Sequence, residues 1–149
     1  MRDAKTELGE KIQRLKKAQG LSWKDIAQAI GHAPVWSCAA CLGQMSMSAE
    51  AARKTADLLG LSDEEAAILG DIPYRGSLPS AVPTDPLIYR FYELISVYGT
   101  TWKALIHEEF GDGIMSAIDF DMTLERQPDP KGDRVKMVLS GKFLPYKQY

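Results

Sequence analysis

Three side chains in the C-terminal half of the chain are of types that could bind a small anion or orient the group that binds it. Arg90 and Glu93 are three residues apart, so a helix would place them side by side among strongly apolar neighbours. A guanidinium oriented by a carboxylate presents forked donors to carboxylate-like oxygens, which predicts an anion site. The same spacing is also typical of an intrahelical ion pair on a solvated face, which contributes about a few tenths of a kcal/mol. The spacing alone leaves both interpretations open.

Ser116 is the third candidate and lies in a glycine turn followed by small residues, 110–118. Backbone N–H groups of this segment and the Ser116 hydroxyl can face an anion, although a purely structural turn explains the segment equally well. Neither a nucleophile elbow nor a P-loop is present, and no histidine lies in a motif that would make it a base for Ser116. Serine-hydrolase chemistry is therefore not supported, and we expect His107 to make a packing or helix-end contact.

Cys38 and Cys41 have the C-x-x-C spacing of redox and zinc sites, and the chain has no other cysteine. Zinc needs four ligands, and only the scattered His32 and His107 remain to supply them. The pair lies late in an alanine-rich helical pattern, whereas a thioredoxin-like motif follows a strand. We therefore expect two small apolar side chains rather than a redox or metal site.

Apolar residues at helical spacing predict a compact all-helical domain over residues 1–70. Glycines follow several of these patterns, and serines precede three of them as capping residues. The predicted helices span residues 3–19, 22–30, 34–42, 49–59 and 62–70.

Four prolines between residues 71 and 86 predict a proline-rich linker. Helical periodicity resumes from residue 87 to 98, breaks at Gly99 and resumes over 101–110, which predicts two further helices. The period then changes to two, with alternation over residues 120–125 and 135–139 on either side of a turn. This pattern predicts a β-hairpin, and because a lone hairpin is marginal in water, its partner must be this chain's helices or a second chain's hairpin.

Residues 22–42 have the helix, glycine turn and helix of a repressor-type helix-turn-helix unit. The second of these helices, however, carries no charged residue, and residues 1–70 hold 9 Lys and Arg against 9 Asp and Glu. A DNA reader needs a basic face and side chains that reach phosphates and bases, so nucleic acid is disfavoured. Val35 and Trp36 instead suggest a protein interface, with a buried core helix as the alternative.

Composition excludes several other classes of protein. The chain has 149 residues, 45% of them hydrophobic and 26% charged, and a net charge of -2, as in an ordinary globular protein without a global positive field. No apolar run is long enough to span a bilayer, and the N-terminus lacks a signal-peptide pattern. We expect a cytoplasmic protein that contacts no membrane.

Specific motifs in the C-terminal half of the chain resemble those of a known family. The C-terminal half of the chain resembles that of the cyanase family, whose members are also called cyanate hydratases or cyanate lyases. The motifs that carry the resemblance are residues 83–86, 89–93, 98–101 and 110–120, together with the terminal Gly-Lys-Phe-Leu-Pro at 141–145. The resemblance extends over nearly the whole chain and is most specific between residues 83 and 120. One departure is Ser77, because the family often has a cysteine in this region.

The resemblance implies a fold that is mainly α with a small α+β C-terminal part. A helix-turn-helix-like bundle that does not bind DNA would occupy residues 1–70, and the linker residues 71–86. Residues 87–149 would form a catalytic, dimer-forming domain with a short helical segment and a hairpin that intertwines with its twin. The family assembles as a decamer of five dimers, so we expect a homo-oligomer.

The resemblance also implies a reaction. The family converts cyanate and bicarbonate to carbamate and carbon dioxide, and carbamate then yields ammonia and a second carbon dioxide. Matched residue by residue, the family's catalytic residues fall on Arg90, Glu93 and Ser116, with no metal or organic cofactor. A helix-turn-helix DNA-binding regulator without activity and a small interaction module remain the alternatives.

Overall fold

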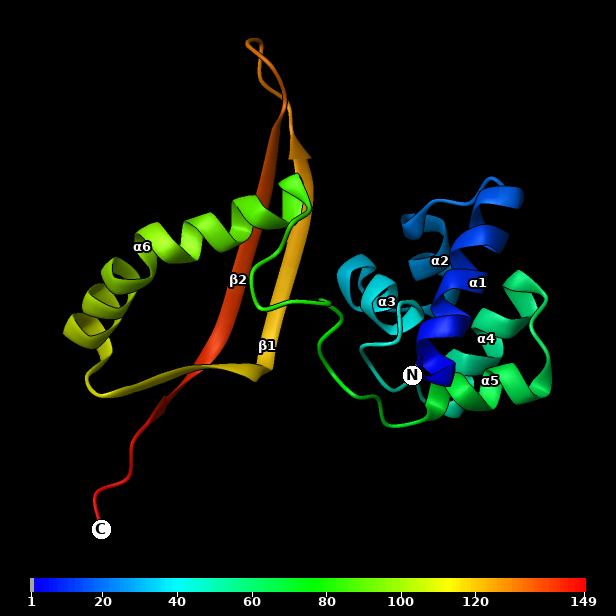
Figure 1. Cartoon of the computed structure of the whole chain (residues 1–149), viewed down its shortest axis with the longest axis horizontal. Coiled ribbons are helices and arrows are strands. Elements are labelled where there is room, and N and C mark those ends of the chain that lie inside the picture. Colours follow the sequence, from blue (N-terminus) through cyan, green and yellow to red (C-terminus); the bar gives the residue numbers. More distant parts are fainter. Residues whose placement is uncertain (1) are drawn as a thin grey trace. The chain divides into compact units, whose positions relative to one another are not determined.

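The computed structural model describes residues 2–149, so Met1, the first residue of the expected helical domain, lies outside the described residues. The chain divides into two compact units, of which the first ends at Ser77 and the second is Leu78–Tyr149. Figure 1 shows helices alone in the first unit and a long helix with a two-stranded ribbon in the second.

Five helices form the N-terminal unit, as predicted (Figure 1). Serine caps begin three of them, since each serine oxygen accepts an otherwise unpaired N–H of the first turn. Ser22 and Ser62 do so in full capping boxes with Asp25 and Glu65. The five helices are α1 (Ala4–Ala18), α2 (Trp23–Ile30), α3 (Pro34–Cys41), α4 (Ala49–Leu59) and α5 (Asp63–Gly70).

The apolar stripes of these helices meet in one core. Ile12 and Ile26 are fully buried, and Leu59 of α4 packs in the same cluster. Burial of each such side chain stabilises the unit by about 1.5–3 kcal/mol. This packing stabilises short helices that would be only marginally stable in isolation. The N-terminal unit therefore has a complete core of its own.

One long helix, α6 (Pro86–Phe110), opens the second unit (Figure 1). Its first turn is set by Pro86 at the first helical position and by Asp85, whose side chain accepts the N–H groups of Leu87 and Ile88. The prediction of two helices separated at Gly99 was wrong, because α6 runs through Gly99 without a break. A glycine inside a helix costs only about 1 kcal/mol relative to alanine, which a helix of 25 residues tolerates.

The predicted β-hairpin is confirmed. Strands β1 (Gly113–Gln127) and β2 (Arg134–Pro145) pair antiparallel, and both are longer than the alternating pattern indicated. The register is regular from the turn up to the pair Phe120 and Gly141, and it then shifts before Met115 pairs with Phe143. This interruption is a bulge, and it explains why the period-two pattern stopped at residue 120.

The second unit does not bury its apolar side chains within one chain. No residue of α6 is buried, although the helix is rich in aliphatic and aromatic residues. Ile95 is 60% exposed and Leu105 59% exposed, where core residues of the first unit are below 10%. Within residues 2–149 no helix combines the length and hydropathy needed to cross a bilayer. The exposed apolar surface of α6 is far larger than scattered single residues would give.

Candidate active site

Arg90 and Glu93 lie side by side on α6. The Nη1 of Arg90 is 3.4 Å from Oε2 of Glu93, and the two side chains are 62% and 53% exposed. The ring of Tyr89 lies against the guanidinium, with its centroid 5.8 Å from the central carbon. A pair this long and this exposed contributes little to stability. Most of the guanidinium's five N–H donors thus stay accessible to an anion.

Ser116 is buried in the bulge of β1. Its Oγ accepts two backbone hydrogen bonds, one from the N–H of Ile118 at 3.0 Å and one from the N–H of Asp119 at 2.9 Å. A hydroxyl oxygen has two acceptor lone pairs, and both are engaged here. Only the O–H group of Ser116 has no partner among these contacts, so it is free to donate a hydrogen bond. Nucleophilic attack is disfavoured because it would need one of the two engaged lone pairs.

The contacts of Ser116 favour the structural interpretation for part of segment 110–118, which the sequence left open. The N–H of Ile118 points to the Ser116 oxygen and not to an anion. The physical reason is the bulge, whose backbone is closed by these two side-chain contacts. The N–H groups of Ile118 and Asp119 are therefore not free to bind an anion, whereas the O–H of Ser116 can still donate.

The structure brings two of the three predicted site residues together. Within residues 2–149, no hydrogen bond or ion pair joins Ser116 to Arg90 or Glu93. Arg90 and Glu93 lie on an exposed helix face, whereas Ser116 is 5% exposed in a strand.

His107 makes the helix-end contact predicted for it. Its Nδ1 lies 2.9 Å from the carbonyl oxygen of Gly111, and its Nε2 lies 2.6 Å from the Nζ of Lys103. Because the lysine ammonium only donates, Nε2 accepts and Nδ1–H donates to the carbonyl. Both ring nitrogens are thus engaged at the C-terminus of α6.

One of the two thiols lies in the core of the N-terminal unit, and the other is partly buried. Both are free, and Cys41 is buried in α3. Burial raises the pKa of the Cys41 thiol to about 12 and also raises the pKa of Cys38. A protonated thiol is a poor nucleophile and a poor metal ligand, which favours the structural interpretation of this pair. Within residues 2–149, no three His, Cys, Asp or Glu side chains gather as metal ligands would.

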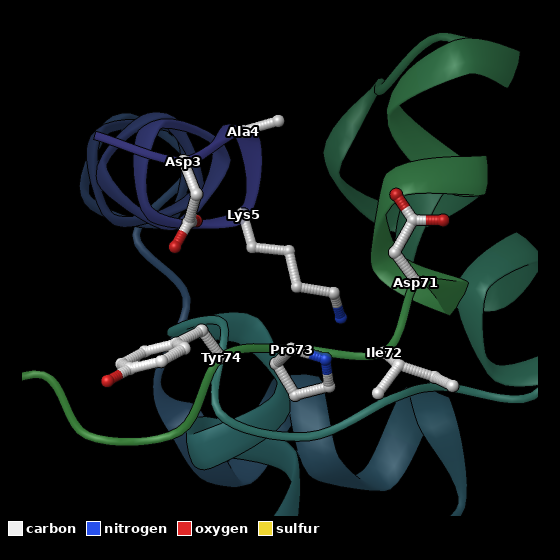
Figure 2. Close-up of a pocket in the computed structure, with 7 residues that line it drawn as sticks. All are labelled: Asp3, Ala4, Lys5, Asp71, Ile72, Pro73 and Tyr74. Carbon is white, nitrogen blue, oxygen red and sulfur yellow. The ribbon is translucent and has the colours of Figure 1, made fainter. Parts of the chain in front are cut away.

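Lys5 is a buried charge that no local pattern predicts, because a lysine near a helix start normally faces water. It is 7% exposed, and its Nζ donates to the carbonyls of Met45 at 2.9 Å and Leu69 at 3.0 Å. Burial lowers the pKa of Lys5, and the nearby carboxylate of Asp71 opposes this effect. Figure 2 shows the lysine side chain reaching from α1 toward the segment after α5, at a pocket of about 170 Å³. With two N–H groups given to backbone carbonyls, the ammonium ties three segments of the unit together.

The second helix of the helix-turn-helix-like part does not favour DNA recognition. Helix α3 has no charged residue, and the ring of Trp36 packs against that of His32 at a tilt of 34°, with the ring centroids 4.3 Å apart. Trp36 is only partly buried and packs against the core, so the core interpretation holds for part of its surface. The uncharged helix lacks the side chains that contact phosphates.

Comparison with protein-family models matches both parts of the chain. The model described as "Cyanate hydratase, N-terminal" matches residues 5–73, and the "Cyanate lyase C-terminal domain" model matches residues 80–148. Arg90, Glu93 and Ser116 all fall within the second match.

Curated relatives are similar over almost the full length. A protein named "Cyanate hydratase" from Methylibium petroleiphilum is 60% identical over 146 residues, covering 98% of this chain and 99% of the relative. A "Cyanate hydratase" from Cupriavidus necator is 58% identical, covering 97% and 99%. The crystal structure of cyanase from T. urticae is similar with a TM-score of 0.80 and 40% identity, covering 93% of this chain and 97% of that one. The resemblance seen in the motifs is confirmed, and the chain belongs to the cyanate hydratase family, whose members are also called cyanases or cyanate lyases.

Proposed function

We propose that this protein is an enzyme that decomposes cyanate with bicarbonate as co-substrate. The observation that carries the proposal is the full-length identity of 60% to a relative named cyanate hydratase. Cyanate, bicarbonate and one proton give carbamate and carbon dioxide, and carbamate with a second proton gives ammonia and carbon dioxide. Such an enzyme, in the cytoplasm, removes a reactive anion and releases nitrogen as ammonia.

Arg90 and Glu93 are proposed to bring the two anions together. Two monoanions repel each other, so their site must supply positive charge and oriented donors. The exposed guanidinium of Arg90 provides both, and Glu93 at 3.4 Å limits its orientation. Holding the reactants in attack geometry supplies much of the rate gain without a metal or organic cofactor. Chelator treatment followed by dialysis should therefore leave turnover unchanged.

Ser116 is proposed to donate its O–H to an ionised substrate or transition state. Its oxygen already accepts two N–H groups, which orients the remaining proton away from the bulge. A hydrogen bond to a charged group contributes about 1.5–3 kcal/mol. Ser116→Ala should therefore lower turnover by about 10- to 150-fold while the assembly survives. Steady-state rates with sedimentation of the same samples test this, and full activity of an intact variant would show a structural serine.

The proposed assembly is a homo-oligomer, a decamer of five dimers, in which several chains share each site. Support comes from α6, which has no buried residue, and from the lack of any hydrogen bond or ion pair between Ser116 and the Arg90 pair within residues 2–149. A second chain that covers α6 would remove its apolar face from water and can supply the missing site residues.

Ammonia release tests the proposed reaction directly. Purified protein is incubated with cyanate, with and without added bicarbonate, in buffer freed of carbon dioxide. We expect ammonia only when bicarbonate is present, with two carbon dioxide molecules for each cyanate consumed. Ammonia formation independent of bicarbonate would contradict the co-substrate, and no ammonia under either condition would contradict the activity.

DNA binding is the alternative that the charge pattern disfavours. Residues 1–70 carry 9 Lys and Arg against 9 Asp and Glu, and α3 has no charge. Because this unit has no excess of cationic side chains to neutralise phosphates and release their counterions, we expect no appreciable duplex binding at physiological salt. A fluorescence-anisotropy titration with mixed-sequence duplex DNA measures this. Sub-micromolar affinity that falls steeply with added salt would overturn the expectation.

A further inference from the structure

The bulge that holds Ser116 is unusually wide. Met115 pairs with Phe143 and Phe120 pairs with Gly141, so the four residues 116–119 of β1 lie opposite the single residue Lys142 of β2. The extra backbone must fold over the partner strand. It does so above Gly141, which is the last regular pair before the bulge.

Gly141 leaves the space that the bulge fills. A Cβ at this position would lie 2.6 Å from Cγ of Met115 and closer still to the carbonyl oxygen of Ser116. Ordinary van der Waals contact begins at 3.4 Å, so the side chain of Met115 would have to move by about 0.8 Å (3.4 minus 2.6) and the Ser116 carbonyl by more.

Backbone conformation does not require glycine here. Gly141 is absent from the glycines with positive φ, which include Gly132 and Gly111. Any residue can adopt its extended backbone, and only the missing Cβ distinguishes glycine at this position. A substitution to alanine thus tests space alone.

We infer that Gly141 is a positioning residue for catalysis, because the absence of its side chain lets the β1 bulge seat Ser116 where its hydroxyl can donate to the reacting anion. The inference rests on the proposed role of Ser116. The displacement of a catalytic group by about 1 Å costs about 100-fold in rate. Gly141→Ala should therefore lower kcat by about 10- to 100-fold, with the assembly intact.

A double-mutant cycle separates this role from a merely structural one. The variants are Ser116→Ala, Gly141→Ala and the double variant, each measured for kcat of ammonia release and for sedimentation. If Gly141 acts through Ser116, the double variant should lie within about 3-fold of Ser116→Ala, because displacing an absent hydroxyl costs nothing further. Gly70→Ala is the matched control, since a Cβ there meets nothing closer than 3.6 Å. It should keep the wild-type rate.

A second variant tests whether Gly141→Ala lowers kcat by displacing the Met115 side chain rather than the Ser116 carbonyl. Met115→Ala combined with Gly141→Ala leaves the Ser116 carbonyl as the displaced group, and the same loss of kcat relative to Met115→Ala alone is expected. Full activity of Gly141→Ala, losses that multiply in the double variant, or failure of both Gly141 variants to assemble would each overturn the inference. Full activity of Ser116→Ala would instead remove the proposed role of that serine, and a wild type without turnover would remove the proposed function.

Discussion

Arg90→Leu should abolish turnover almost completely. Two unit charges about 4 Å apart interact by about 4 kcal/mol near a protein surface, and the guanidinium is the group proposed to offset the repulsion between two bound monoanions. Loss of that amount corresponds to about a thousandfold in rate. Leucine keeps much of the side-chain bulk, so the defect should be electrostatic, and Glu93 would be left as an unpaired negative charge beside the substrates.

The measurement is kcat for ammonia release, with sedimentation of the same sample to verify assembly. Lys103→Leu is a suitable control, because it removes one positive charge from the same helix at a residue that contacts His107. Its rate should stay within a few-fold of wild type. Arg90→Lys should retain part of the activity, since charge survives but the forked donors do not. An intact Arg90→Leu oligomer with wild-type turnover would show that the arginine is structural.

The second large effect concerns the monomer, which should not exist with both of its units folded. Helix α6 buries none of its residues within one chain, and Ile95 alone is 60% exposed. A hairpin of two strands is marginal in water without a partner for its apolar face. The second unit therefore gains its core through association, and its stability should depend on protein concentration.

Analytical ultracentrifugation over a dilution series tests this expectation. Ile95→Glu places a charge in the apolar face of α6 and should give chains that neither assemble nor keep the second unit folded by circular dichroism. Gln28→Glu, on an exposed position of α2, adds the same charge and should assemble normally. A compact species of 16.5 kDa at micromolar concentration would contradict an obligate oligomer.

Local signals in the sequence were sufficient to predict the helices of the N-terminal unit. The capping boxes at Ser22 and Ser62 and the glycine at residue 60 are short-range patterns, and the helix ends they predict agree with the structure. Gly99 shows the limit of such signals, because a helix propensity cost of about 1 kcal/mol does not say whether the helix stops.

The site was only partly predictable. The three-residue spacing of Arg90 and Glu93 fixes their proximity on any helix. Ser116 could be named from family motifs, but its burial and its two accepted N–H groups depend on a bulge that breaks the period-two pattern. Gly141 had no local signal of its function, since its importance arises from a strand that pairs across the hairpin.

The protonated thiols of α3 bear on how the protein survives its proposed substrate. Cyanate carbamoylates cysteine through the thiolate and not the thiol. Raising the pKa of Cys41 from 9.0 to about 12 lowers its thiolate fraction at neutral pH roughly a thousandfold. Cys38 is shifted in the same direction, and the chain has no third cysteine. Burial in the core of the N-terminal unit thus protects Cys41 from carbamoylation during turnover, and the raised pKa of the partly buried Cys38 acts in the same direction.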